Sequence, residues 1–386
     1  MKETIYLDHN ATAPLSARAR QVWLEAQDRF LGNPASLHRV GQRAERALEE
    51  ARERLAVFLK AGADSLVWTS GATEGANAVL AHWGAIAEAE QGVWVASGEH
   101  PCVAEAAERW FPGRVKWLPL TADGRLEWDA LEKLQEERPV GVCLQAANNE
   151  TGVLQPWREV AQQCRALGVP VLCDATQWMG RLAGAGLGGV DYVIGSAHKC
   201  GGPVGVGFLK VKTGAFRAWT VGGGHEEGRR AGTQNVAGVL AMAEAFAEGE
   251  ERQREVEGRL AERRVWEEAL KREIPGSRIL GENVERLWNT VSVLLPELED
   301  CRNRWVVRLD AAGVAGSTGA ACAGGSARAS RGLRAMGIFP EAADRSLRLS
   351  GGWDSTRVEW ETAREALVEI HRRHGATPVR IPGKTA

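Results

Sequence analysis

The chain has 386 residues, with 48 Lys and Arg against 50 Asp and Glu, and a formal charge of −2 at pH 7. The length suits two domains better than one, and the balanced charge argues against nucleic acid as a partner, because phosphate binding needs a concentrated basic excess. The N-terminus lacks the layout of a secretion signal, and no apolar run approaches the roughly 18 residues of a membrane span, so we expect a cytoplasmic protein with no membrane partner. The seven cysteines include no Cys-x-x-Cys pair, so we expect reduced thiols and no metal site.

The first elements are an extended segment, a loop and a helix. Residues 5–14 form a short extended stretch ending in a polar turn, and residues 32–36 are typical of a loop. A helix is predicted over residues 40–58, because apolar residues recur there at three- and four-residue steps. Short apolar strands then alternate with helices. The predicted strands are residues 65–69, 93–96, 115–118, 140–145, 170–173, 192–194 and 205–211, and the helices between them are 76–89, 102–110, 127–137 and 156–167.

This alternation predicts an α/β fold with a mostly parallel, seven-stranded sheet covered on both faces. Ligands of such sheets bind at the carboxyl ends of the strands. After Gly232 the pattern changes to a long charged helix or helix pair, followed by an α+β arrangement. Its predicted elements are helices at 236–273, 300–312 and 356–373 and strands at 290–295 and 346–349. We expect a large domain over residues 15–250, and a smaller α+β domain formed by residues 1–14 and 251–386.

Polar clusters follow several predicted strands. Residues 70–75 contain small side chains that would expose backbone N–H groups to an anion at a helix N-terminus, although an ordinary turn fits equally well. His100 and the run 148–152 also follow strands, where a structural histidine and ordinary turn residues are common. Asp174 ends an apolar strand, and burial of its carboxylate requires a partner. Lys199 follows another strand and is either a solvated amine or a desolvated nucleophile.

Each cluster is a weak signal alone, but together they favour a site at one edge of the sheet. The chemistry they fit is that of pyridoxal phosphate (PLP), which needs a lysine for a Schiff base, an anion at the pyridinium nitrogen and a phosphate cradle. Lys199, Asp174 and residues 70–75 can supply these three groups.

Cys322 is a further candidate for chemistry. Most cysteines are small buried hydrophobic residues, and this interpretation suits Cys143 and Cys173, which lie within predicted strands. Cys322 instead lies in a Gly/Ala/Ser-rich stretch, residues 313–330, with too little bulk to form a core. An exposed thiol there could react, although exposure does not establish reactivity.

The chain resembles the cysteine desulfurases, which are class V aminotransferase-type PLP enzymes of fold type I. The motifs that carry the resemblance occur in order along nearly the whole chain. They are residues 6–14, 32–38, 69–74, 99–100, 148–152, 174–177, 196–199, 230–233, 319–322 and 347–350.

The resemblance implies roles for the cofactor residues. Lys199 would hold PLP covalently, Asp174 would pair with the pyridine nitrogen, and Gln177 would contact the ring hydroxyl. His100 would stack on the ring and assist proton transfer. The residues expected at the cofactor phosphate are Ala72, Thr73, Ser196 and His198, joined by Thr233 from the partner subunit of a homodimer.

The resemblance also implies the reaction. Asn149 would contact both cofactor and substrate, and Arg348 would bind the carboxylate of L-cysteine. Cys322 would take the sulfur as a persulfide, releasing L-alanine, and pass it to an acceptor or scaffold protein for iron–sulfur cluster or thio-cofactor biosynthesis. Two alternatives stay open: a related lyase, such as a selenocysteine lyase or another carbon–sulfur lyase, and a non-catalytic protein that kept the fold.

Two departures from the family pattern affect selectivity and acceptor choice rather than the cofactor. The loop around Cys322 carries alanines where the family usually has serine or threonine. Trp353 stands where the family commonly has another arginine.

Overall fold

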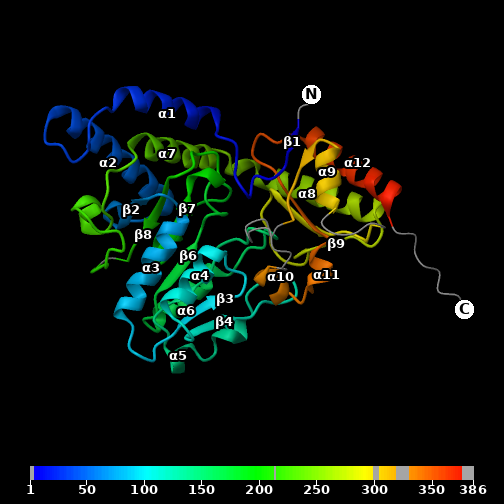
Figure 1. The fold of residues 1–386 in the computed structure, drawn as a ribbon, viewed down its shortest axis with the longest axis horizontal. Helices are drawn as coiled ribbons and strands as arrows, with labels where there is room; N and C mark the ends of the chain where they lie inside the picture. Colours follow the sequence, from blue (N-terminus) through cyan, green and yellow to red (C-terminus); the bar gives the residue numbers. More distant parts are fainter. Residues whose placement is uncertain (1–3, 213, 299–303, 319–329, 376–386) are drawn as a thin grey trace, which may run out of the picture.

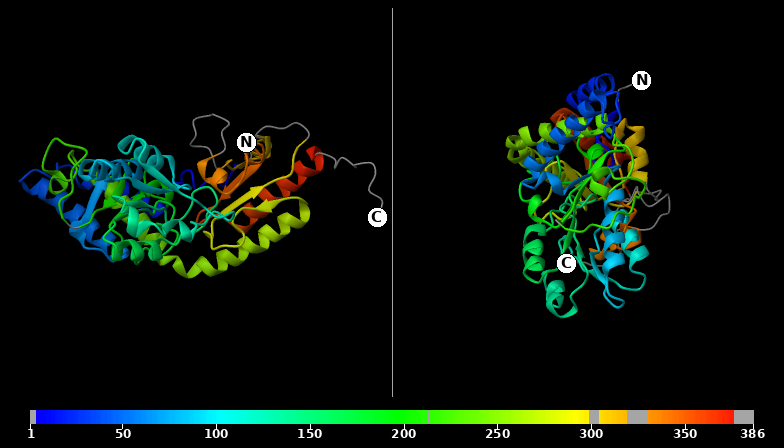
Figure 2. Two further views of the ribbon diagram at one scale, coloured as in Figure 1. Left: turned by 90° about the horizontal axis from the view of Figure 1, so that it is seen from below. Right: turned by 90° about the vertical axis from the view of Figure 1, so that its left-hand side faces the viewer.

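Figure 1 shows the computed structural model, which describes residues 4–212, 214–298, 304–318 and 330–375. The chain forms a larger part built on one wide sheet and a smaller part beside it, and Figure 2 shows the two parts lying end to end. The Cys322 stretch from 319 to 329 lies outside the described residues.

The larger part contains a seven-stranded sheet in which only β8 runs against the other strands. The prediction of a mostly parallel, seven-stranded α/β sheet is therefore confirmed. Its strands, in spatial order, are β2 (Leu66–Thr69), β8 (Gly207–Lys210), β7 (Tyr192–Ser196), β6 (Val171–Asp174), β5 (Val142–Cys143), β3 (Val93–Ala96) and β4 (Val115–Leu118).

Helices cover both faces of this sheet. Neighbouring strand residues point to opposite sides, and both sides carry apolar side chains that the helices bury. Cys173, for example, packs into the core on one face and Leu172 into the core on the other. One core includes side chains from α2 (Arg39–Leu59), α6 (Trp157–Ala166) and α7 (Val236–Glu251), and the other includes side chains from α3 (Ala72–Ile86) and α4 (Pro101–Trp110).

The smaller part contains an antiparallel sheet with the order β12 (Ser346–Ser350), β10 (Thr290–Leu294) and β9 (Arg278–Ile279). Near it, β1 (Ile5–Tyr6) pairs in parallel with β11 (Val314–Ala315). Its helices are α8 (Val256–Glu273), α9 (Arg304–Ala311), α10 (Arg331–Ala335), α11 (Pro340–Ala343) and α12 (Arg357–His374). Leu7 packs into the same core as Leu270, Leu347 and Leu367. This shared core supports the predicted domain division, which stays a prediction.

Several segments differ from the sequence prediction. The predicted strand 140–145 is only Val142–Cys143, and β9, α10 and α11 were not predicted. Residues 127–137 form a short 3-10 helix, Trp128–Leu131, and one turn of α5 (Leu134–Glu137) rather than one helix. Only Leu131 and Leu134 of these elements are buried, which is too small an apolar face to support a long helix. Helix α1 (Ala17–Arg29) was not predicted, because it packs on α7 mainly through small residues such as Ala19. The prediction for residues 236–273 was one long helix or a helix pair, and the structure has a helix pair, α7 and α8.

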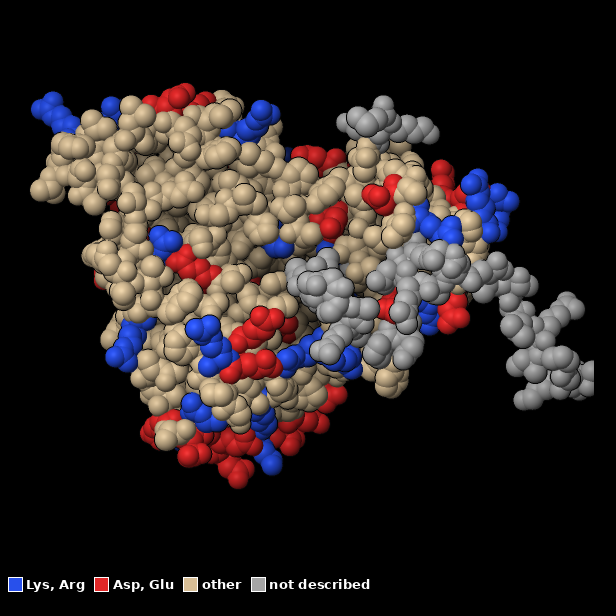
Figure 3. All heavy atoms as spheres, viewed as in Figure 1, with Lys and Arg blue, Asp and Glu red and all other residues tan. Residues whose placement is uncertain are grey.

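Positive and negative side chains are mixed over the face seen in Figure 3, with acidic residues gathered at its lower edge around α5. Exposed acidic residues of this region include Glu127, Asp129, Glu132, Glu136 and Glu137. In the part of the chain that the structure describes, no helix combines the length and apolar character needed to cross a membrane.

Candidate active site

A cavity of about 330 Å³ lies at the carboxyl ends of the sheet strands, a size typical of small-molecule sites. It brings together every predicted site residue except Thr233 and Cys322. The predicted residues that line it are Ala72, Thr73, His100, Asn149, Asp174, Gln177, Ser196, His198, Lys199 and Arg348. Thr233 lies exposed in the segment before α7, and Cys322 lies outside the described residues.

The lysine loop is held by the N-terminal segment. Lys199 ends a short 3-10 helix that directly follows β7, and its Nζ donates to the backbone carbonyls of Asn10 at 2.9 Å and Ala11 at 2.7 Å. His198 Nδ1 lies 3.2 Å from Thr12 Oγ1. Burial, followed by the charges of Lys199 and Arg181, lowers the pKa of His198 to about 4. His198 is therefore neutral near pH 7.

The start of α3 forms a cradle beside the lysine loop. Gly71 adopts φ 154° and ψ 177°, a conformation that essentially only glycine reaches. Ser196 Oγ accepts from the backbone N–H of Ala72 at 2.8 Å, which joins the end of β7 to the first turn of α3. First-turn N–H groups have no acceptor within their own helix, so this end of α3 favours an anion.

Two buried carboxyl groups lie at or just after strand ends at this edge of the sheet, and Asp174 lines the cavity. Asp174 ends β6, and its Oδ1 accepts from the backbone N–H of Thr176 at 2.9 Å. Glu99 is also buried and accepts from the backbone N–H of Gln145 at 2.5 Å. Burial, and secondly the charge of Asp174, raises the pKa of Glu99 well above its usual range. Burial beside the Asp174 carboxylate thus favours the protonated form of Glu99.

His100 caps the N-terminus of α4 and faces the cavity. Its Nδ1 accepts from the backbone N–H of Cys102 at 3.2 Å, so the neutral ring carries its proton on Nε2. Burial lowers the pKa of His100; the charge of Lys199 acts in the same direction and that of Asp174 opposes it. The ring is thus a neutral group with an N–H to offer.

The cavity contains buried polar atoms that fit PLP. Gln177 Nε2 donates to the Asn10 carbonyl at 3.0 Å. Gln177 Oε1 and Thr176 Oγ1 are buried without a hydrogen-bond partner, although both residues line the cavity. Unpaired buried oxygens are uncommon in folded proteins and indicate a polar ligand. Together with the lysine amine, the Asp174 carboxylate and the anion cradle, these atoms form a donor set that suits PLP.

Arg348 lines the cavity from β12 of the smaller part. Only 3% of this residue is exposed, and its Nη2 donates to Asp8 Oδ1 at 2.6 Å. Nη1 donates to the Asn149 carbonyl at 2.9 Å, while the buried Nε has no hydrogen-bond partner. This guanidinium therefore retains capacity for a carboxylate ligand.

Sequence reasoning missed several contributors to the site. Asp8 and Asn10 entered only as part of a motif, without a role, yet Asp8 binds Arg348 and Asn10 binds Gln177 and Lys199. The available signal was the polar run that interrupts an apolar N-terminal segment. The other missed lining residues are Ala11, Cys102, Gln145, Ala147 and Thr176.

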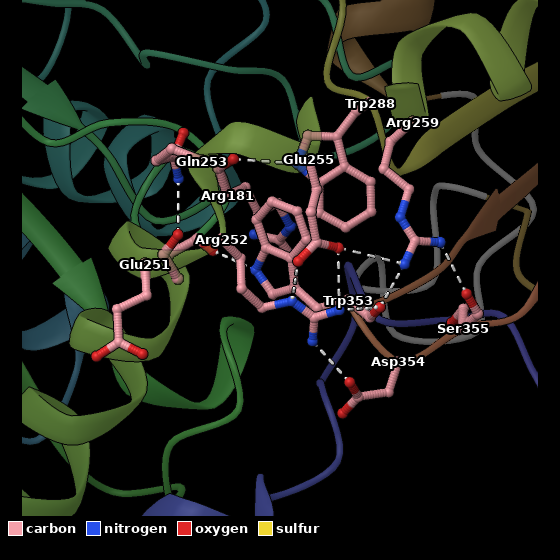
Figure 4. A network of polar contacts seen from close by, with 12 residues as sticks. Arg181, Glu251, Arg252, Gln253, Glu255, Arg259, Trp288, Trp353, Asp354 and Ser355 are labelled. Carbon is pink, nitrogen blue, oxygen red and sulfur yellow. Dashed lines mark hydrogen bonds and ion pairs between the residues drawn. The ribbon is translucent and has the colours of Figure 1, made fainter. Parts of the chain in front are cut away.

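Trp353, at the position where the family commonly has arginine, stacks on Trp288 in this structure (Figure 4). The two ring centroids are 4.1 Å apart and the planes are inclined by 34°. Trp353 Nε1 donates to the Gly180 carbonyl at 2.8 Å, and Trp288 Nε1 donates to the Arg181 carbonyl at 3.0 Å. The tryptophan pair therefore ties the smaller part to the loop that follows β6.

Two arginines brace the same joint (Figure 4). Arg252 and Arg259 donate to the Trp353 carbonyl at 2.8 and 2.7 Å, and Arg252 also pairs with Asp354 at 2.7 Å. The Arg252 guanidinium lies 5.3 Å from the Trp353 ring centroid. Trp353 thus contributes to the joint between the two parts. It lines a neighbouring cavity together with Lys199, but not the cavity that holds both Lys199 and Arg348.

Comparison with known proteins identifies the family. The aminotransferase class-V family model matches residues 5–351. The cysteine desulfurase of Frankia sp. (strain EuIK1) is 35% identical, over 97% of this chain and 94% of its own length. The chain belongs to the cysteine desulfurases of the class-V aminotransferase family.

Further relatives agree with this assignment. The cysteine desulfurase IscS of Anaeromyxobacter sp. (strain Fw109-5) is 34% identical to this cysteine desulfurase, over 97% of this chain and 94% of its own length. A solved NifS-like protein matches 96% of this chain and 100% of its own, with a TM-score of 0.86 and 29% identity. The predicted family and fold type are therefore confirmed, while the roles of individual residues stay predictions.

Proposed function

We propose that this cysteine desulfurase removes the sulfur of L-cysteine, producing L-alanine and a persulfide on Cys322. The observation that supports the proposal is the cavity that holds the Lys199 amine, the Asp174 carboxylate and the Arg348 guanidinium together. These are the groups needed to anchor PLP, keep its ring nitrogen protonated and bind an amino-acid carboxylate.

The proposed cofactor residues are those that the family resemblance implies, and the donor set of the cavity supports them. Lys199 would hold PLP covalently, Asp174 would face its ring nitrogen, and Gln177 would use its unpaired Oε1 toward the ring hydroxyl. The phosphate would lie against Ala72, Thr73, Ser196 and His198. When bound, PLP supplies an electron sink for the bond changes at the substrate carbon.

The surrounding side chains hold the substrate and move its protons. Arg348 and Asn149 orient the carboxylate of cysteine, and the Lys199 amine takes the proton from its α-carbon. His100 is neutral near pH 7 and offers Nε2–H to groups in the cavity. An amine and a neutral imidazole in one enclosed site permit proton transfer without bulk water.

The sulfur transfer requires a thiolate on Cys322. The carbon–sulfur bond of the substrate breaks as a sulfur–sulfur bond forms on Cys322. The electron pair left on carbon takes up a proton to yield alanine, and the sulfur ends as the outer atom of the persulfide. No external oxidant is needed, because the substrate carbon is reduced as the transferred sulfur is oxidised.

The cellular setting is part of the proposal. The enzyme would act in the cytoplasm as a homodimer, with Thr233 reaching the phosphate of the partner subunit. An acceptor or scaffold protein would take the persulfide sulfur for iron–sulfur cluster or thio-cofactor biosynthesis.

The test compares the wild-type enzyme with Cys322→Ala. The purified wild type should carry a visible absorption band of lysine-bound cofactor and form alanine and sulfide from cysteine in the presence of a thiol reductant. Cys322→Ala should keep the band and lose both products. Continued turnover in this variant would assign the chain to a lyase that does not use the thiol, and a colourless wild type would contradict the cofactor itself.

A further inference from the structure

The segment before α7, residues 225–235, is held against α2 and β2 by the buried carboxylate of Glu226. The Glu226 side chain is fully buried, at 0% exposure, and pairs with Arg52 through two hydrogen bonds of 2.9 and 3.2 Å. Glu226 also accepts from the backbone N–H of Trp68 at 3.0 Å and from Gln234 Nε2 at 3.0 Å. Four donors thus surround one carboxylate, which links α2, β2 and the residues leading into α7.

The backbone at this point is strained. Glu226 and Glu227 have φ angles of 50° and 56°, so two consecutive non-glycine residues occupy the left-handed region. Such conformations cost about 1 kcal/mol or more each and persist only where surrounding contacts hold them. The contacts of Glu226 supply that constraint, and strained segments of this kind concentrate at functional sites.

Part of the arrangement has a purely structural explanation. Strand β2 is at the edge of the sheet, and the Trp68 N–H and Leu66 carbonyl on its free side bond to Glu226 and Arg52. Edge strands need such partners. Strand β2 leads directly into the phosphate cradle at residues 70–73. By pairing the edge of β2, Glu226 and Arg52 would therefore also support the cofactor site of their own subunit.

Both neighbours of Thr233 are hydrogen-bonded, one of them to Glu226. Its neighbour Gln234 bonds to Glu226, and the backbone N–H of Gly232 donates to His225 Nδ1 at 3.3 Å. Slightly earlier, Arg230 pairs with Glu74 of α3 at 2.7 and 3.2 Å. Thr233 itself is exposed, between neighbours that are held in place. A side chain presented outward from a fastened segment is preorganised for contact with a second molecule.

We propose that Glu226 is a positioning residue that holds Thr233 in place for the cofactor phosphate of the partner subunit. This inference rests on the proposed homodimer and assigns Glu226 an effect across the interface rather than within its own subunit. Loss of the carboxylate leaves Thr233 on a less ordered segment, so the partner binds PLP less tightly. We expect PLP release to be about tenfold faster than in the wild type, which corresponds to about 1.4 kcal/mol.

Three variants test the contacts. Glu226→Gln removes the charge, whereas Gln234→Leu leaves the ion pair and the edge of β2 intact and removes only the bond beside Thr233. Both should accelerate PLP release from the dimer, measured as loss of the cofactor absorption band during exchange into buffer without PLP. The matched control is Glu49→Gln. The Glu49 side chain also pairs with Arg52 but is 54% exposed, so its loss should leave the rate of PLP release unchanged.

Mixed dimers separate the two possible directions of the effect. In each dimer, Lys199→Ala on one subunit leaves a single covalent cofactor site. When Glu226→Gln is on the same subunit as Lys199→Ala, the remaining site receives Thr233 from the altered segment, and release should be about tenfold faster. When Glu226→Gln is on the other subunit, the remaining site receives Thr233 from an intact segment, and release should match that of the Lys199→Ala mixed dimer alone.

The reverse pattern would overturn the inference, because it would mean that Glu226 acts through β2 on its own subunit. Normal release from Gln234→Leu would also contradict it. Should Glu226→Gln fail to fold, Gln234→Leu in the same mixed dimers replaces it. Wild-type protein that turns over cysteine but sediments as a monomer would overturn the inference while the proposed desulfurase activity stands.

Discussion

The two sides of the cavity are assembled in different ways. On the cofactor side, Asp174 and Ser196 end neighbouring strands of one sheet, and Lys199 follows within three residues. On the substrate side, Arg348 depends on Asp8 and Asn149, which are 340 and 199 positions away in the chain. The strand-end positions of the cofactor side are thus set by a single sheet, although Lys199 and Gln177 also bond to Asn10. Arg348 is held by residues that come from distant segments of the chain.

This difference suggests that the two sides can be damaged separately. Changes at the strand ends should affect cofactor retention, because those residues share one framework. Changes around Arg348 should affect cysteine recognition or the stability of the joint, while the cofactor stays bound. The following predictions rank the expected effects from largest to smallest.

Lys199→Ala should have the largest effect. It removes the amine that anchors PLP and the base at the substrate carbon, so the visible cofactor band and cysteine turnover should both disappear. Absorption spectra before and after gel filtration measure the first loss, and alanine formation measures the second. A variant that keeps a covalent band would show that another residue anchors the cofactor.

Arg348→Lys should break the substrate side alone. Lysine keeps a positive charge but cannot form the paired hydrogen bonds of a guanidinium, so kcat/KM for cysteine should fall about 100-fold. This corresponds to about 3 kcal/mol of lost transition-state stabilisation. The cofactor band should survive gel filtration as in the wild type, and its loss would contradict the separation of the two sides.

Glu150→Gln should change how stability depends on pH. The half-buried Glu150 carboxyl accepts from Ser330 Oγ at 2.6 Å, and loss of solvent around it raises its pKa from 4.5 to about 7 against the effects of Ser330 and Arg348. Its contribution to stability is therefore complete below about pH 4.5 and is lost as pH rises through about 7. Glutamine does not ionise and avoids this loss.

Between about pH 4.5 and pH 8, the free energy of unfolding of Glu150→Gln should therefore improve relative to wild type by about 3 kcal/mol. This change is about 1.36 kcal/mol for each pH unit between about 4.5 and about 7, and none above that. Urea unfolding across this range measures the change. Glu53→Gln, an exposed change on α2, is the matched control and should show no such trend. Parallel pH curves for wild type and Glu150→Gln would show that Glu150 ionises normally in the folded protein.

Trp353→Ala should have the smallest effect, confined to the joint between the two parts. It removes the stack on Trp288 and the hydrogen bond to the Gly180 carbonyl, at a cost of about 2 kcal/mol in unfolding free energy. Cofactor retention should not change. Trp128→Ala, at a 48% exposed site, should cost under about 0.5 kcal/mol. Equal losses of unfolding free energy in Trp353→Ala and Trp128→Ala would show that the stack of Trp353 on Trp288 does not stabilise the protein.

The sequence predicted the cofactor side better than the substrate side, for physical reasons. Apolar runs marked most strands, and β3 and β4 match their predicted ranges, so the polar clusters at their ends could be assigned to one edge of a sheet. No local pattern could connect Asp8 with Arg348, because their pairing depends on β1 reaching β11 and on the bridge between Asp8 and Ser350. The family resemblance supplied Arg348, but not its partner.

Some features could not be predicted from periodicity at all. Helix α1 buries mainly small residues, so its apolar face is weak, and the charged stretch 127–137 lacks the apolar spacing that would distinguish one long helix from two short ones. Glu226 lies in an irregular segment, and its role depends on a distant edge strand. The roles of Thr233 and Cys322 stay predictions that rest on the resemblance.

The most direct test of the central claim is the mass of the Cys322 peptide after incubation with L-cysteine and rapid alkylation. The wild-type peptide should gain one sulfur atom, the other six cysteine positions in the same digest should stay unmodified, and Lys199→Ala should show no gain anywhere. An unmodified Cys322 peptide in an enzyme that is forming alanine would contradict the account.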